Sequence, residues 1–150
     1  MKDRIFVIDG SSYLYRAYHA MPPLSTSTGR PTGAVKGVTN MLMNLKKDSE
    51  GSPIIVVFDA KGKTFRNEIY SEYKANRPPM PDELRLQLDP VKSICKAIGF
   101  PLIEIKGVEA DDVIATITRM AKDAEYKCVV SSLDKDLMQL VEDPDTTLMN

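Results

Sequence analysis

The sequence predicts an α/β fold in which a mostly parallel central sheet of about five strands is flanked by helices. Two observations support this prediction. Short apolar runs without polar alternation indicate strands that are buried on both faces, which is typical of a parallel sheet. The segments between these runs repeat apolar residues at helical spacing, and strands that alternate with helices form layered α/β domains with right-handed crossovers.

Five apolar runs are the predicted strands, and the last of them is the weakest. They cover Ile5–Ile8, residues 53–58, Pro101–Ile105, Lys127–Val130 and Thr146–Met149. The first run ends in Asp9-Gly10-Ser11-Ser12, which has the composition of a polar turn.

Three helices are predicted from apolar stripes over residues 35–45, 84–98 and 110–121. Pro90 lies inside the second stripe and predicts a kink or a junction between two helices. Gly99 follows that stripe at the position where a left-handed residue commonly ends a helix. Residues 21–33 are rich in Pro, Gly, Ser and Thr, and they predict a loop.

Composition excludes several classes of protein. The length of 150 residues fits one domain, and 20 Lys and Arg against 21 Asp and Glu leave no global basic field for nucleic acid. Two Cys and one His are too few for a tetrahedral zinc site or a disulfide framework. No apolar run reaches the roughly 18 residues of a membrane span, and none resembles a signal peptide. We therefore expect a soluble, intracellular domain without a membrane partner.

Acidic side chains follow four of the predicted strands. Because the carboxyl ends of parallel strands share one edge of a sheet, where ligands bind, we expect these side chains to converge. They are Asp9, Asp59, Glu109, Asp111, Asp112, Asp134 and Asp136.

Such a cluster predicts bound cations. Two like charges about 4 Å apart repel by roughly 4 kcal/mol at an effective dielectric constant near 20. Oxygen donors without His or Cys select Mg²⁺ or Mn²⁺, and two such ions are the usual clamp for water attack on a phosphodiester. For any single carboxylate, a structural role in a turn or at a helix N-terminus remains open.

Residues 60–81 form a local basic patch that is interleaved with aromatic residues. By default this pattern is a solvated helix face, but beside an acidic metal site it predicts contacts with nucleic acid, because cations hold phosphates and aromatic rings stack on bases. The patch contains Lys61, Lys63, Phe65, Arg66, Tyr70, Tyr73, Lys74 and Arg77.

Five motifs, in order along nearly the whole chain, resemble the 5′-nuclease domain of bacterial DNA polymerases I, in the flap endonuclease superfamily. The motifs occupy residues 6–17, 57–66, 73–81, 107–114 and 134–141. The resemblance implies a PIN-like fold with a helical-arch insertion at about residues 60–90. It also implies a nuclease that hydrolyses 5′ flaps and RNA primers at junctions of single-stranded and duplex DNA, in replication and repair.

The resemblance also implies roles for individual residues. The seven carboxylates match the family's metal ligands for Mg²⁺ or Mn²⁺, with two ions in the complete domain and as few as one in this chain. Lys74 and Arg77 match basic catalytic residues at the base of the arch, and Arg16 and Tyr73 match further substrate contacts. Lys61, Lys63 and Arg66 would bind the strand that passes through the arch.

The sequence departs from the family at its end. Family members continue into a helix–hairpin–helix region that holds duplex DNA, and residues 1–150 stop before it. We expect the N-terminal part of a nuclease domain from the bacterial cytosol or nucleoid, with a polymerase domain downstream in a full-length parent. An impaired fragment that binds metal and single strands without efficient cleavage is the alternative. A receiver-type or phosphatase-type phosphotransfer domain ranks last, because no Lys accompanies the last strand.

Overall fold

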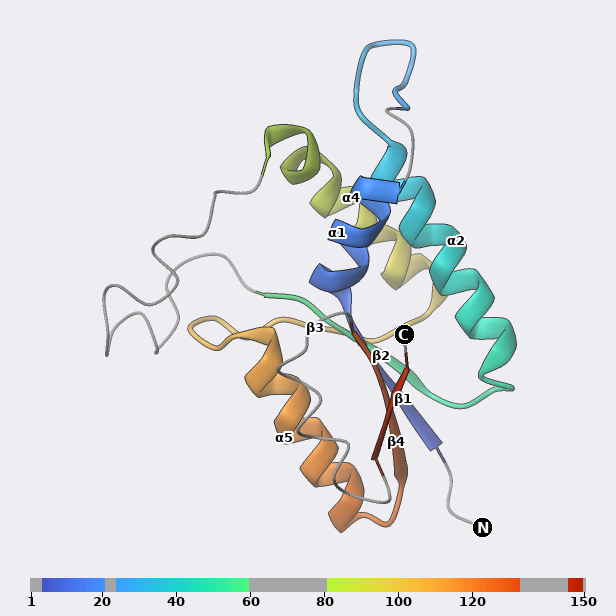
Figure 1. The fold of residues 1–150 in the computed structure, drawn as a ribbon, viewed down its shortest axis with the longest axis vertical. Helices are drawn as coiled ribbons and strands as arrows, with labels where there is room; N and C mark the ends of the chain where they lie inside the picture. Colours follow the sequence, from blue (N-terminus) through green and yellow to red (C-terminus); the bar gives the residue numbers. More distant parts are fainter. Residues whose placement is uncertain (1–3, 21–23, 60–80, 133–145, 150) are drawn as a thin grey trace.

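The structure is a computed structural model that describes residues 4–20, 24–59, 81–132 and 146–149. Its helices and strands alternate along the chain and form a layered α/β domain (Figure 1). In chain order they are β1 (Arg4–Asp9), α1 (Gly10–Ala20), α2 (Gly33–Asp48), β2 (Ile54–Val57), α4 (Asp82–Ile98), β3 (Leu102–Ile103), α5 (Ala110–Asp123), β4 (Lys127–Ser131) and β5 (Thr146–Met149). The predicted fold class is confirmed.

All five strands form one parallel sheet in the order β3-β2-β1-β4-β5. The chain builds outward from β1 through β2 to β3 and then returns to the other side of β1 for β4 and β5. The strand order therefore reverses between β1 and β4. In open α/β sheets such a reversal opens a crevice at the carboxyl ends of the strands, where ligands bind.

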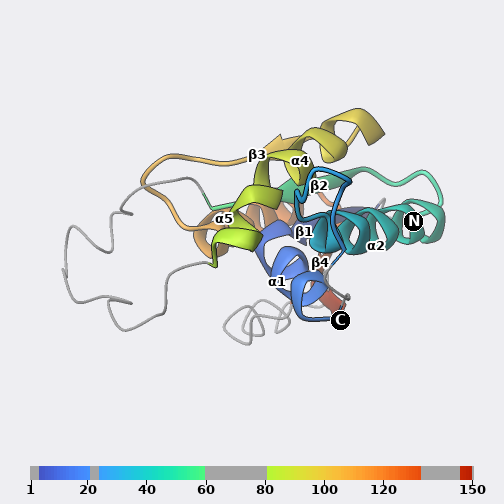
Figure 2. The same ribbon diagram turned by 90° about the horizontal axis from the view of Figure 1, so that it is seen from above.

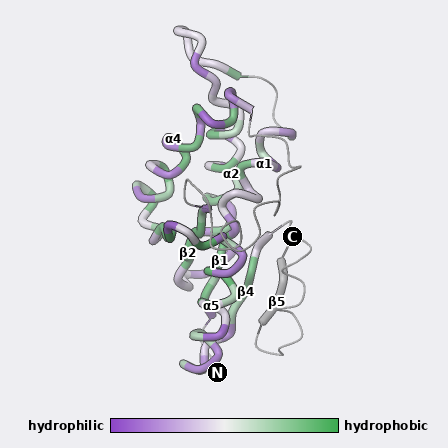
Figure 3. Tube along the Cα trace, turned by 90° about the vertical axis from the view of Figure 1, so that its left-hand side faces the viewer, coloured by the Kyte–Doolittle hydropathy of each residue, from purple (hydrophilic) through white to green (hydrophobic). Residues whose placement is uncertain are grey.

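Helices cover the sheet on both faces. Helices α1, α2 and α4 pack on one face and α5 packs on the other (Figures 1 and 2). Strand β1 supplies both cores, because Phe6 and Ile8 point into the first core and Val7 points into the second. Val7 and Ile8 are 0% exposed. The central strands are accordingly hydrophobic along most of their length (Figure 3), as expected for strands buried on both faces.

The predicted elements agree with the structure, with one exception and one correction. All five strands and the three striped helices are present, and Gly99 ends α4 with a left-handed φ of 101°. Residues 24–32 form the expected loop, closed by an antiparallel bridge between Ser25 and Pro31. The described residues contain no helix with both the length and the apolarity that crossing a bilayer requires.

The correction concerns Pro90, and the exception is helix α1. A junction between two helices at Pro90 is wrong, because α4 runs through this residue as one helix. Pro90 removes one backbone donor, while the buried side chains of Leu84, Val91 and Cys95 hold α4 against the sheet on either side of it. Helix α1 was not predicted, because its opening residues Gly10-Ser11-Ser12 have the composition of a turn.

Gly10 packs directly under the ring of Phe58. A Cβ atom at Gly10 would lie 2.6 Å from Phe58 Cζ, and Phe58 is only 1% exposed. We expect Gly10→Ala to lower the free energy of unfolding by about 1–3 kcal/mol, the usual cost of overpacking a core. Urea denaturation checks this value. With Phe58→Leu added, the double variant should cost less than the sum of the two single variants, and simple additivity would contradict the contact.

Cys95 is buried as a free thiol in α4. Burial raises the pKa of Cys95 from its ordinary value to about 11, although a backbone hydrogen bond opposes the shift. The unfolded thiol ionises at a lower pH, so the stabilisation from the neutral buried thiol is complete below pH 9.0 and is lost as the pH rises towards about 11. We expect Cys95→Val to make the unfolding free energy less dependent on pH in this range. Equal pH dependence in both proteins would contradict it.

Candidate metal centre

The carboxyl edge of the sheet brings together the ends of β1, β2 and β4 and the N-terminus of α5. Asp9 is the last residue of β1, and it pairs in register with Val57 at the end of β2. Asp59 follows two residues later. Since both strands are parallel, their carboxylates lie at the same edge, beside the point where the strand order reverses.

Asp9 is 4% exposed and uses both carboxylate oxygens. The backbone N–H of Ser12 donates to Oδ1 at 3.2 Å, and the hydroxyl of Ser132 donates to Oδ2 at 2.8 Å. The bond from Ser12, three residues on, is the one that an N-cap residue makes at the start of a helix. Asp9 therefore caps α1 and also connects β1 to the end of β4.

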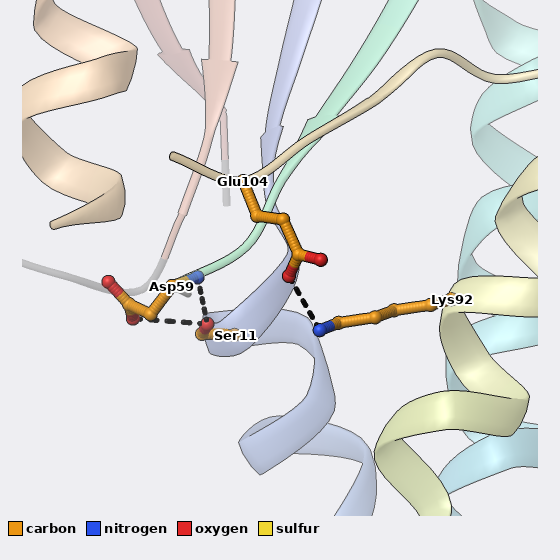
Figure 4. A network of polar contacts seen from close by, with 4 residues as sticks. All are labelled: Ser11, Asp59, Lys92 and Glu104. Atoms are coloured by element: carbon orange, nitrogen blue, oxygen red, sulfur yellow. Dashed lines mark hydrogen bonds and ion pairs between the residues drawn. The ribbon is translucent and has the colours of Figure 1, made fainter. Parts of the chain in front are cut away.

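Asp59 is exposed and contacts the first residues of two helices. Its Oδ1 accepts the backbone N–H of Ala110 at 2.7 Å, and its Oδ2 accepts the hydroxyl of Ser11 at 3.2 Å. The Asp59 N–H donates to the same hydroxyl at 3.5 Å (Figure 4). Glu109, the N-cap residue of α5, makes no side-chain cap bond, so Asp59 supplies this cap from a distant part of the chain.

Three more of the predicted carboxylates lie at the start of α5. Glu109 is 8% exposed, and Asp111 and Asp112 are half-buried in the first helical turn. The buried side chains of Val113 and Ile114 pack this helix on the second core. The Asp59–Ala110 bond and this packing together bring the α5 carboxylates to the edge that carries Asp9 and Asp59.

An ion pair connects α4 with the residue that follows β3. Lys92 on α4 donates to Glu104 at 2.6 Å (Figure 4). Its ammonium also lies 5.7 Å from the centre of the Phe58 ring. The Lys92 side chain is 13% exposed. The pair joins α4 to the segment after β3. No pattern in the sequence predicts it.

The donors at this edge fit a hard divalent cation. Five of the predicted ligands lie within the described residues, and all of them offer carboxylate oxygens. We call Asp9, Asp59, Glu109, Asp111 and Asp112 the five described carboxylates. The hydrogen bonds to Asp9 and Asp59 given above come from neutral N–H and O–H groups. Each carboxylate oxygen has two lone-pair sites, so an oxygen that accepts a hydrogen bond can also coordinate an ion. Within the residues that the structure describes, no three His, Cys, Asp or Glu side chains already form a group that could hold a metal ion. The seven-carboxylate cluster thus stays a prediction.

Several predicted site residues lie outside the described residues. They are two metal-ligand candidates, Asp134 and Asp136, and the arch residues Lys61, Lys63, Arg66, Tyr73, Lys74 and Arg77.

Within the described part of the chain, two cavities lie beside α1, and neither is lined by Asp9, Asp59 or the α5 carboxylates. The larger of the two, about 670 Å³, is lined by Tyr18 and His19 among others. The smaller, about 440 Å³, lies between α1 and α2 and is lined by Arg16, Asn40 and Asn44. The structure therefore places Arg16, a predicted substrate contact, in a groove between α1 and α2.

A buried hydrogen bond joins α1 to the end of β4 at 2.5 Å, between the hydroxyls of Tyr13 and Ser131. Burial raises the pKa of Tyr13, while the bond to Ser131 and the charge of Arg16 oppose this shift.

The sequence did not predict the roles of Ser11, Ser131 and Ser132, because a serine after a strand is equally typical of any turn.

Comparison with known proteins identifies relatives over nearly the whole chain. A family model described as "5′-3′ exonuclease, N-terminal resolvase-like domain" matches residues 4–150. DNA polymerase I of Pseudomonas aeruginosa is 58% identical over 146 residues, which are 97% of this chain and 16% of that polymerase. A 5′-3′ exonuclease of Aquifex aeolicus is 46% identical over 139 residues, which are 93% of this chain and 48% of that protein.

A solved structure shares the fold. The T5 D15 protein, co-crystallised with metal ions, superposes with a TM-score of 0.73 at 25% identity and covers 97% of this chain and 53% of its own. The chain thus spans about half the length of the exonuclease and of the T5 protein, and a smaller part of the polymerase.

Asp59 can be tested as a helix cap separately from its charge. Asp59→Asn keeps an oxygen that accepts the Ala110 N–H, whereas Asp59→Ala removes it. In metal-free buffer we expect the Ala variant to be less stable than the Asn variant by about 1 kcal/mol, the typical value of an N-cap. Urea unfolding followed by circular dichroism measures the difference. Equal stabilities would show that the bond contributes nothing to α5.

Proposed function

Because the chain belongs to the family of 5′-3′ exonuclease N-terminal resolvase-like domains, we propose that it is the metal-binding part of a structure-specific 5′-nuclease. Its relatives include a 5′-3′ exonuclease and a DNA polymerase I, and the chain spans only part of each. The activity, substrates and partners of the whole protein are part of this proposal.

One observation carries the proposal from the structure itself. Asp59, after β2, is hydrogen-bonded to the first residue of α5, and Glu109, Asp111 and Asp112 lie in or next to that helical turn. Asp9 ends the adjacent strand at the reversal of the strand order. A sheet edge of this kind is the expected ligand site, and carboxylates are the ligands that Mg²⁺ and Mn²⁺ prefer.

The five described carboxylates, with Asp134 and Asp136, would hold one or two Mg²⁺ or Mn²⁺ ions. When bound, such ions polarise the scissile phosphate and lower the pKa of an attacking water. The chain's own carboxylates would hold the ions, and hydrogen bonds orient these side chains: Asp9 is fixed by Ser12 and Ser132, and Asp59 by Ser11 and Ala110.

The proposed substrate is DNA with a 5′ flap or a junction of single strand and duplex, including RNA primers, during replication and repair in the bacterial cytosol. Lys74 and Arg77 would grip the scissile phosphate, and the other basic and aromatic residues of segment 60–81 would hold the strand. The exposed Arg16 on α1 would add a further cationic contact. A polymerase domain would follow in a full-length parent, as in the Pseudomonas relative.

The proposal predicts metal-dependent cleavage that depends on Asp112. We expect the chain to cleave a 5′-flap duplex in Mg²⁺ or Mn²⁺, to lose cleavage in excess chelator, and to lose at least about 100-fold in rate on Asp112→Ala, because a ligand charge is removed. Gel-based cleavage of flap, nicked and single-stranded substrates measures these rates.

Asp123→Ala is the matched control, because it removes the same charge from the exposed opposite end of α5. We expect this variant to cleave like the unmodified chain. Robust cleavage in chelator would overturn the metal mechanism. Binding of manganese and single-stranded DNA without turnover would instead favour a non-catalytic binding fragment.

A further inference from the structure

We propose that Ser132 is a positioning residue, which orients the carboxylate of Asp9 for a divalent cation. The proposal rests on the proposed function, because it concerns the same metal centre. It assigns a role in ion binding to a residue that is neither charged nor part of the predicted ligand set.

The geometry that carries the proposal is a buried contact across the reversal of the strand order. The parallel register of β1 and β4 ends at the pair Ile8 and Ser131. Asp9 is the last residue of β1 and Ser132 directly follows β4, and the Ser132 hydroxyl donates to Asp9 Oδ2 at 2.8 Å. Asp9 is 4% exposed and Ser132 is 2% exposed. Strand pairing therefore fixes both ends of this bond, although the residues are 123 positions apart.

The chemistry of the contact suits a carboxylate that must stay charged. The Ser12 N–H holds Oδ1 and the Ser132 hydroxyl holds Oδ2, so both oxygens of Asp9 have a defined direction. Neither donor is cationic, so neither competes with an ion as the side chain of Lys or Arg would. Hydrogen bonds of this kind to metal-binding side chains preorganise the site and commonly change metal affinity about 10-fold to 100-fold.

A purely structural role for Ser132 makes a different prediction. In that case the hydroxyl only provides a hydrogen bond to a buried carboxylate. Its loss then lowers the free energy of unfolding without a specific effect on the affinity for ions. Ser131 provides a matched control, because it is the adjacent residue, is also 2% exposed and also makes a buried hydrogen bond. Its partner is the hydroxyl of Tyr13, which is not a carboxylate.

The experiment is calorimetric titration of the 150-residue chain with Mn²⁺, with urea unfolding in chelator measured in parallel. We expect Ser132→Ala to bind Mn²⁺ about 10-fold to 100-fold more weakly, and Ser132→Thr, which keeps the hydroxyl, to bind like the unmodified chain. Ser131→Ala should lose stability but keep its Mn²⁺ affinity. If Ser132→Ala does not fold, the nearly isosteric Ser132→Cys carries the same expectation.

Unchanged affinity in a folded Ser132→Ala variant would overturn the positioning role and leave the proposed nuclease function intact. An equal loss of affinity in Ser131→Ala would also overturn it, because the effect would then be a general loosening of the end of β4. An unmodified chain that binds no Mn²⁺ would overturn the proposed metal mechanism together with this role. The two failures are therefore distinguishable.

Discussion

The burial of β1 between two helical layers is the constraint on which the rest of the molecule depends. This strand pairs in parallel with a neighbour on each side and contributes side chains to both cores. Since all its neighbours run in the same direction, the polar residues that end them meet at one edge. Asp9 is held at that edge with almost no solvent, and burying a charge is costly unless it is hydrogen-bonded. The bonds from Ser12 and Ser132 meet this requirement.

Two of the carboxylates that are predicted to bind an ion also make structural hydrogen bonds. The sequence leaves open whether any single aspartate merely caps a helix, and the structure shows that Asp9 caps α1 and Asp59 caps α5. These bonds do not exclude ion binding, because a carboxylate oxygen that accepts a hydrogen bond can also coordinate an ion. They fix the directions of the oxygens, and the proposed metal centre would need preorganisation of this kind.

Local sequence patterns predicted most of the helices and strands, but they could not predict the contacts between segments that are distant in the sequence. Continuous apolar runs such as Ile5–Ile8 locate strands because burial on both faces leaves no room for polar alternation. Helix α1 was not predicted because Gly10 is typical of a turn. In the fold, Gly10 allows the ring of Phe58 to approach the backbone.

The candidate site also has features that the sequence predicts and features that it does not. That Asp9 and Asp59 share an edge follows from parallel strands alone, so it could be predicted from their position after two apolar runs. The contacts of Asp59 with Ala110 and of Asp9 with Ser132 depend on register and on helix packing. Nothing in the local sequence encodes these contacts. The predicted arch residues between Lys61 and Arg77 lie outside the described residues, and their roles stay predictions.

The pairing of β1 with β4 also has a consequence for how the chain acquires its structure. During synthesis β1 emerges first, yet one of its two ladders cannot close until β4, more than a hundred residues later, has left the ribosome. Pairings of such high contact order form slowly. Until then one edge of an apolar strand stays open to other nascent chains, which is a recognised route to aggregation. Among the described strand pairs, the central strand of the sheet thus waits for its second neighbour over the longest stretch of chain.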